Sequence, residues 1–342
     1  MNRQRPVVDI HSHLYPRWYI DMLKARTEIP RVSGQEGDER FVIFPDEAAR
    51  GSGGGRPMTE DYWSIETKLA FMDRHGIDRT VLSLGNPWFE PFDAEASLAA
   101  ARRLNDDFAT LAQRTGGRII GMGVLPRGGI DAVVAVVGEV ADREGLAGVV
   151  SGTRIAGHAL DDEALEPVWE ALERTGVPLL LHPHHGSAMD ELGGFGHALP
   201  VAVGFPLETT IALARLMLAG VLHRHPGIRL VASHGGGTLP YLAGRLDAGW
   251  RSDASLSARA PSPPTTVIGR LYLDAVLYHP RALRAAADLV GTHHLAFGTD
   301  HPFSIADPGA NLAAIDEAFA DADAGQVLAG TAAELYAIGA VT

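Results

Sequence analysis

Two histidines end the first apolar segment of the chain, Val7-Val8-Asp9-Ile10-His11-Ser12-His13. Residues two apart on a β-strand point to the same side. A strand here would therefore aim both imidazoles at one point, where a metal ion can bind. An isolated His-x-His can also be two polar residues in a turn. Three later residues favour the metal site, because His182, His234 and Asp300 each come just after an apolar, strand-like run.

The rest of the chain alternates between short apolar runs and longer segments with helical periodicity. The predicted strands are 7–10, 79–84, 118–124, 147–150, 177–181, 228–232, 271–275 and 295–297. The predicted helices are 62–75, 95–115, 130–143, 161–175, 207–224, 239–250 and 280–290, with closing helices at 307–320 and 326–337. Continuous apolar runs are typical of parallel strands that are buried on both faces. The alternation predicts an α/β fold.

The choice between an open sheet and a barrel depends on where the candidate ligands lie. An open doubly wound sheet fits the alternation, but no Gly-x-Gly-x-x-Gly follows the first strand. The candidate ligands follow strands 1, 5, 6 and 8, whose carboxyl ends meet only in a closed barrel. We therefore predict a single domain, residues 1–342, with a (β/α)8 TIM-barrel fold. Residues 14–60 would be a cap or lid inserted after strand 1, with a flexible glycine run at 51–55 and short strands around 41–44.

Composition excludes several classes of partner and ligand. The formal net charge of −13 argues against nucleic acid and anionic membrane as partners, since both require basic patches. The chain has no cysteine, so disulfides, thiolate ligands and a cysteine nucleophile are excluded. A metal would need nitrogen and oxygen ligands, which suit zinc, manganese or iron. The chain enters a core strand almost at once, and no apolar run approaches ~18 residues, so we expect a soluble cytoplasmic protein.

His11, His13, His182 and Asp300 together offer three imidazoles and one carboxylate. This set suits one divalent metal and leaves room for a water, whose pKa the metal would lower. His234 is a possible fifth member, and a histidine that does not bind the metal can carry a proton. Barrels with two metals often bridge them with a carboxylated lysine after strand 4. The stretch 148–152 has no lysine, so we predict a mononuclear site.

Several stretches resemble the amidohydrolase superfamily, and more closely its aminocarboxymuconate semialdehyde decarboxylase branch. They are Asp9–Pro16, Leu181–Pro183, Gly204–Thr210, Ser233–Gly237, Leu242–Asp247 and Phe297–Phe303. The resemblance extends from about residue 7 to about residue 302, and it is weakest between residues 15 and 56.

The resemblance implies roles for individual residues. His11, His13, His182 and Asp300 would bind one metal ion, usually zinc and in some relatives manganese, with His234 beside it as general acid and base. Arg56 would bind a substrate carboxylate, which matches the planar, bidentate guanidinium. Arg245 would bind a carboxylate from the neighbouring subunit, which implies a homodimer. Without the resemblance, each arginine would be read as a solvated surface residue. Trp63 and His185 complete the predicted substrate contacts.

Three positions depart from the family pattern. His184 and His185 stand where the decarboxylase branch has Trp-Asp, His301 replaces a tyrosine, and Arg154 replaces a histidine. We expect these residues to face the pocket, so the substrate would differ from aminocarboxymuconate semialdehyde and be polar and anionic. Alternatively, His185 or His301 would orient a metal ligand or His234.

The predicted function is a metal-dependent, non-oxidative decarboxylase of an unsaturated or aromatic carboxylic acid. His234 and Asp300 would move the proton. A hydrolase of an amide, lactone or carbon–carbon bond is the alternative, because the same metal site can activate water. A non-catalytic barrel with a vestigial metal is a third possibility, and the complete set of candidate ligands together with His234 argues against it.

Overall fold

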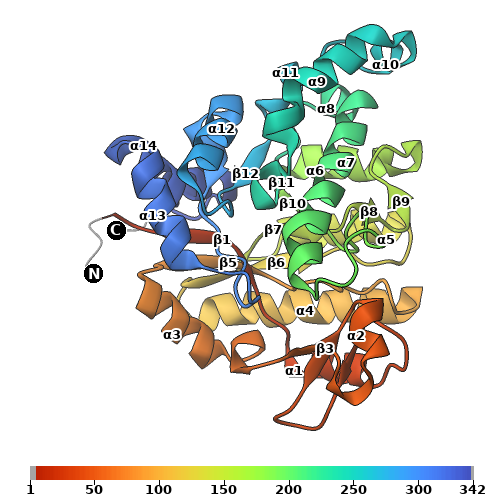
Figure 1. Ribbon diagram of the computed structural model, residues 1–342, viewed down its shortest axis with the longest axis vertical. Helices are drawn as coiled ribbons and strands as arrows, with labels where there is room; N and C mark the ends of the chain where they lie inside the picture. The colour runs from red at the N-terminus through yellow and green to blue at the C-terminus, as the bar shows by residue number, and fades with distance from the viewer. Residues whose placement is uncertain (1–4, 340–342) are drawn as a thin grey trace.

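A computed structural model describes residues 5–339 and contains eight parallel strands in one sheet (Figure 1). In sheet order these are β1 (Val8–His13), β5 (Arg79–Ser83), β6 (Ile119–Val124), β7 (Leu146–Ser151), β10 (Leu179–Leu181), β11 (Leu230–Ala232), β12 (Tyr272–Asp274) and β13 (Leu295–Ala296). The two edges meet through backbone hydrogen bonds, from the Ile10 amide to the Phe297 carbonyl (2.9 Å) and from the Asp300 amide to the His11 carbonyl (2.7 Å). The predicted (β/α)8 barrel is confirmed.

Helices follow most strands and pack around the outside of the barrel. They are α3 (Ile65–His75), α4 (Ala94–Arg114), α5 (Ile130–Ala141), α6 (Glu166–Thr175), α7 (Phe205–Leu218), α8 (Val221–Arg224), α9 (Leu239–Ser252), α10 (Ala254–Arg259), α11 (Thr265–Ile268), α12 (Pro280–Val290), α13 (Pro308–Ala318), α14 (Asp321–Gly325) and α15 (Thr331–Tyr336). The predicted helix 207–224 is divided at Gly220, whose φ of 76° is left-handed. The sequence patterns did not predict α10 and α11, which are only six and four residues long.

The insertion after β1 is more ordered than its composition indicates. It holds α1 (Arg17–Lys24), α2 (Pro45–Ala49) and an antiparallel sheet of β2 (Arg31–Ser33), β3 (Arg40–Val42) and β4 (Arg56–Pro57). Figure 1 shows β3 and α2 at one end of the long axis, with α9 to α11 toward the other. The buried Glu39 carboxylate holds the insertion together, since it accepts hydrogen bonds from Arg17 and Lys24, both at 2.9 Å. A second small antiparallel pair, β8 (Arg154–Ile155) with β9 (His158–Ala159), follows β7.

One continuous helical stretch, Pro200–Leu218, is long and apolar enough to cross a membrane by length and composition, contrary to the expectation from sequence. About half of it (44%) is buried in the protein, and it contains the barrel helix α7, so it is weak evidence for a membrane span.

Candidate metal centre and active site

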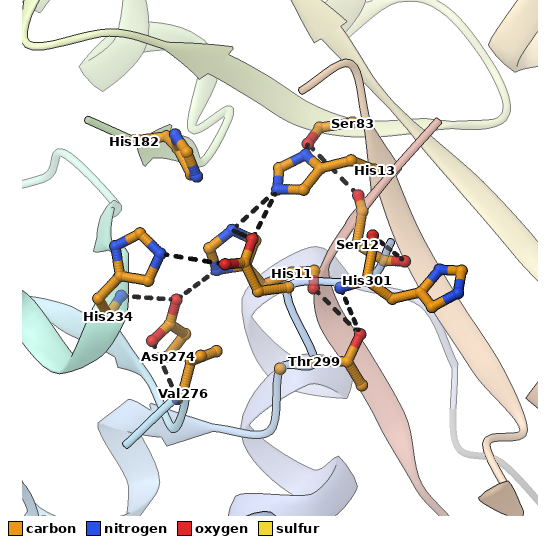
Figure 2. A network of polar contacts seen from close by, with 12 residues as sticks. His11, Ser12, His13, Ser83, His182, His234, Asp274, Val276, Thr299 and His301 are labelled. Carbon is orange, nitrogen blue, oxygen red and sulfur yellow. Dashed lines mark hydrogen bonds and ion pairs between the residues drawn. The ribbon is translucent and has the colours of Figure 1, made fainter. Parts of the chain in front are cut away.

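The first candidate ligands come from β1 and from the segment after β13. The Nε2 atoms of His11 and His13 lie 3.0 Å apart. Asp300 Oδ1 lies 3.3 Å from His11 Nε2 and 3.2 Å from His13 Nε2. All three side chains are buried, and Figure 2 shows the rings of His11 and His13 turned toward each other. As predicted for residues two apart on a strand, both imidazoles face one point, and barrel closure brings Asp300 to the same point.

His182 and His234 complete the cluster from the ends of β10 and β11. Ligand atoms of His11, His182, His234 and Asp300 all lie within 4.8 Å of one another, a spacing that one metal ion could bridge. The Nδ1 atom of His182 donates to the Pro183 carbonyl at 2.7 Å, which leaves a lone pair on Nε2. That Nε2 atom is buried and has no hydrogen-bond partner among the described residues. A buried acceptor without a donor is costly, and a bound cation would satisfy it.

The electrostatics of the cluster also favour a cation. Burial alone would lower the pKa of His11, but the carboxylates of Asp300 and Asp274 raise it to about 9. Burial lowers the pKa of His13 to about 4, and burial beside other histidines holds the pKa of His182 well below its usual range. Burial would raise the pKa of Asp300, but the neighbouring histidines hold it well below 3.8. His13 and His182 are therefore neutral beside an ionised carboxylate, which are groups that zinc and manganese bind, and the raised pKa of His11 shows that the carboxylates favour a positive charge at its imidazole.

Partners behind the ligands fix their orientation. The Nδ1 atom of His11 lies 2.5 Å from Asp274 Oδ2, and that of His13 lies 3.0 Å from Ser83 Oγ. Asp274 also accepts the backbone amides of His234 and Gly235, both at 2.9 Å. Asp274 was not predicted as a site residue, although it lies near the end of the predicted strand 271–275 and is the last residue of β12.

Two of the candidate residues have left-handed backbones. The φ angle is 52° at His234 and 59° at Asp300, a conformation that costs energy outside glycine. At His234 the turn is held by the glycines that follow and by Asp274. At Asp300 it is held by Asp9, whose carboxylate accepts the Thr299 amide at 3.0 Å and the Thr299 hydroxyl at 2.7 Å. The strain turns each side chain toward the cluster.

A small cavity of about 10 Å³ lies against the cluster. Its lining residues are Ile43, Arg56, Asn86, His182, Val201, Phe205, Asp300 and Phe303. The structure thus brings the predicted Arg56 to the centre. The Arg56 side chain is 11% exposed, and its Nε lies 3.2 Å from Glu47 Oε1. Its Nη2 is buried and hydrogen-bonds to no described group, so it can still bind an anion.

The other predicted substrate contacts lie outside this cavity. The Trp63 ring packs against the Arg17 guanidinium at 4.5 Å. Arg245 is exposed on α9. His185 lines a neighbouring cavity of about 250 Å³ together with His184 and Arg154.

His301 does not face the pocket, contrary to our expectation from sequence. Its ring stacks on Phe71 with a centroid distance of 3.7 Å, and its Nδ1 contacts Lys68. Figure 2 shows the His301 ring turned away from His11 and His13. The side chain of the preceding residue, Asp300, instead reaches the cluster, with Oδ1 3.2 Å from His13 Nε2.

Comparisons with known proteins agree with this geometry. Residues 8–338 match the amidohydrolase family Amidohydro_2. The 2-amino-3-carboxymuconate-6-semialdehyde decarboxylase of Dictyostelium discoideum is 29% identical over 290 residues, which are 83% of this chain and 79% of that protein. The crystal structure of Metarhizium anisopliae IDCase in its apo form is 35% identical, with a TM-score of 0.92 over 98% of both chains.

A more distant structure contains a metal. The 5-carboxyvanillate decarboxylase LigW2 of Novosphingobium aromaticivorans was crystallised with bound manganese and 3-methoxy-4-hydroxy-5-nitrobenzoic acid. It is 22% identical, with a TM-score of 0.80 over 98% of both chains, so it supports the fold alone.

Proposed function

This chain belongs to the amidohydrolase family, and from that premise we propose that it is a metal-dependent, non-oxidative decarboxylase of an unsaturated or aromatic carboxylic acid. One observation carries the proposal. The cavity at the His and Asp cluster is also lined by Arg56, which has a buried guanidinium nitrogen without a hydrogen-bond partner among the described residues. A cavity lined both by candidate metal ligands and by an anion-binding arginine suits a carboxylate substrate. Relatives over most of the chain are named as decarboxylases.

In this proposal His11, His13, His182 and Asp300 hold one divalent metal, zinc first and manganese as the alternative. The unpartnered His182 Nε2 supports a metal at this position. A bound metal would polarise a substrate oxygen or lower the pKa of a bound water. The four side chains supply the geometry, Asp274 fixes the tautomer of His11, and Ser83 helps to hold the ring of His13.

His234 would deliver the proton. Decarboxylation breaks the bond between the substrate carbon and the carboxylate, CO2 leaves, and the electron pair that stays on carbon takes one proton. His234 Nε2 lies 3.6 Å from Asp300 Oδ2, so Asp300 can share this proton while it binds the metal. Arg56 would orient the carboxylate, since its guanidinium is fixed by Glu47 and by the rings of Phe41 and Phe44 at 5.4 and 5.7 Å.

We propose a homodimer in which Arg245 enters the partner's site. Arg245 lies on an exposed part of α9 one turn after Tyr241, whose ring is 90% exposed, and Ile211 on α7 is 51% exposed. Exposed apolar residues of this size suit a subunit contact.

Trp63 and His185 would contact only a substrate that extends beyond the cavity at the cluster. In the same proposal residues 1–342 are one cytoplasmic domain, and residues 14–60 are its lid.

A hydrolase on the same site is the alternative, because the same ligands can activate water for attack on an amide, lactone or carbon–carbon bond. Product analysis separates the two reactions. A decarboxylase releases CO2 and a product shorter by one carbon, whereas a hydrolase takes up water and releases two organic fragments.

The test combines metal analysis with a screen of aromatic and unsaturated acids for CO2 release. We expect about one zinc or manganese per chain, lost in His182→Ala and retained in the control His158→Ala, whose partly exposed side chain lies on β9 outside the cluster. Two metals per chain, or hydrolytic products, would move the hydrolase to first place. Absence of metal in a folded chain would favour a non-catalytic barrel.

A further inference from the structure

A lysine is buried behind the metal centre. Lys68 lies on α3, and its side chain is 0% exposed. Its Nζ contacts Ser12 Oγ at 2.8 Å and His301 Nδ1 at 2.5 Å. Lysine is seldom fully buried, because removal of an ammonium group from water is costly unless hydrogen bonds replace the water. A methionine would fill the same space without that cost, so we expect the Lys68 amine to have a specific role.

The two groups that Lys68 contacts lie beside proposed metal ligands. Ser12 stands between His11 and His13 on β1 and points to the other side of the strand. His301 follows Asp300 directly. The two segments also touch each other, since the Ser12 hydroxyl donates to the His301 carbonyl at 3.4 Å. Lys68 therefore joins the first and the last ligand-bearing segments of the barrel from the side opposite the metal.

The donor and acceptor pattern is consistent with this link. An ammonium group can only donate, so His301 Nδ1 accepts the hydrogen bond from Lys68 Nζ. The other ring nitrogen, Nε2, then carries the hydrogen and faces Asp61 Oδ1 at 3.6 Å. Stacking on Phe71 fixes the plane of the ring. Contacts with Lys68, Asp61 and Phe71 thus together fix the position of the His301 ring.

We propose that Lys68 is a positioning residue for the metal centre: by its bonds to Ser12 and His301 it sets the spacing of His11 and His13 relative to Asp300. The inference rests on the ligand set of the proposed function. It assigns a role to a residue that touches neither metal nor substrate. Groups of this kind behind a metal site typically change metal affinity when they are removed.

The test is metal affinity, measured by competition with a chelator on the full-length chain. Lys68→Met keeps the length of the side chain and removes the amine, and we expect it to weaken binding of zinc or manganese by roughly 10- to 100-fold. Ser12→Ala removes one of the two contacts and should weaken binding less. Lys68→Arg keeps the charge and should recover part of the affinity.

Two controls separate positioning from general stability. Lys24→Met removes an ammonium that bonds Glu39 in the insertion and should leave metal affinity unchanged. Val136→Ala in α5 removes buried volume far from the ligand segments and should lower the melting temperature with the same metal affinity.

The proposal is overturned if Lys68→Met binds metal as tightly as the unsubstituted chain. If Lys68→Met does not fold, the metal affinity of Ser12→Ala tests the proposal instead. An unchanged affinity in Ser12→Ala would then overturn the proposal. An unsubstituted chain that binds no metal would instead contradict the ligand set of the proposed function. Because the readout is binding, the result does not depend on which reaction the enzyme catalyses.

Discussion

The orientation of His11 is set by a carboxylate on a distant strand. The contact of Asp274 Oδ2 with His11 Nδ1 places the hydrogen on Nδ1 and the lone pair on Nε2. Burial alone would raise the pKa of Asp274, but His11 and the other neighbours lower it, so the group stays ionised. The same carboxylate holds the amides of His234 and Gly235. One side chain therefore positions both a proposed ligand and the proposed proton donor.

Replacement of this carboxylate should weaken metal binding more than it weakens the fold. Asp274→Asn keeps the shape but removes the charge, and its amide group can place a donor against His11 Nδ1. We expect metal affinity to fall by roughly 10- to 100-fold, measured by chelator competition. Asp253→Asn, at the exposed start of α10, is the matched control and should bind metal normally. Equal affinities in the two variants would show that Asp274 does not orient His11.

The residues that sequence patterns identified share one property. His11, His13, His182 and Asp300 each stand within or just after an apolar run, so strand periodicity alone places them at one end of the barrel. Lys68 could not be found in this way, because a lysine in an amphipathic helix is normally solvent-exposed. Its burial depends on tertiary contacts with Ser12 and His301, which are distant from it in the sequence.

At the scale of secondary-structure elements, the barrel strands were predictable, whereas most of the insertion was not. The barrel strands are continuous apolar runs, and each predicted strand overlaps an observed one. In the insertion, the short strands expected around 41–44 correspond to β3, but β2 and β4 are only three and two residues long, too few for an alternating pattern to be recognised. Their pairing is stabilised by contacts such as the buried Glu39 with Arg17 and Lys24. Such contacts join residues that are separated in the sequence, so a local sequence pattern cannot predict them.

The insertion and the β10–α7 connection (residues 182–204) together cover the metal centre. Ile43 from the insertion and Val201 from the connection both line the small cavity. A second cavity of about 310 Å³ lies between the same two segments and shares Arg56 with the first. A cavity of about 10 Å³ holds roughly one water. An aromatic acid is larger than this cavity, so we expect the two segments to separate when substrate enters the candidate metal site.

A reversible cross-link between these segments tests this requirement. The Gly194 amide donates to Asp46 Oδ2 at 3.2 Å, and a Cβ on Gly193 would lie 3.8 Å from the same oxygen. Since the chain has no cysteine, Asp46→Cys with Gly193→Cys would carry a unique pair. We expect oxidation to reduce decarboxylation by about tenfold or more, and a phosphine reductant to restore it.

The same protein sample serves as its own folding control, because reduction of the disulfide returns the double variant without the cross-link. Each single-cysteine variant should be insensitive to the oxidant. Full activity in a double variant whose disulfide is verified by mass would show that substrate enters without separation of the insertion from the connection.

At the scale of the whole molecule, the proposed dimer would supply the site with a second arginine. The cavity at the cluster has a single arginine, Arg56, on its wall. Arg245 lies on exposed α9, beside the exposed Tyr241. If a second arginine reaches the carboxylate, it comes from a neighbouring copy, and a two-fold dimer would complete both sites at once.

Complementation between two inactive variants tests this arrangement. His182→Ala lacks a metal ligand, and Arg245→Ala lacks the donated arginine, so each homodimer should be nearly inactive. In a mixed dimer, the subunit with His182 receives Arg245 from its partner and forms one intact site. Random pairing makes half of the dimers mixed, so co-expression should restore about one quarter of the unsubstituted activity. If Arg245 instead acted on its own chain, or not on substrate at all, no such recovery would occur. If Arg245 acted on its own chain, every chain in the mixture would lack one essential residue. If Arg245 did not act on substrate, the Arg245→Ala homodimer would be active alone.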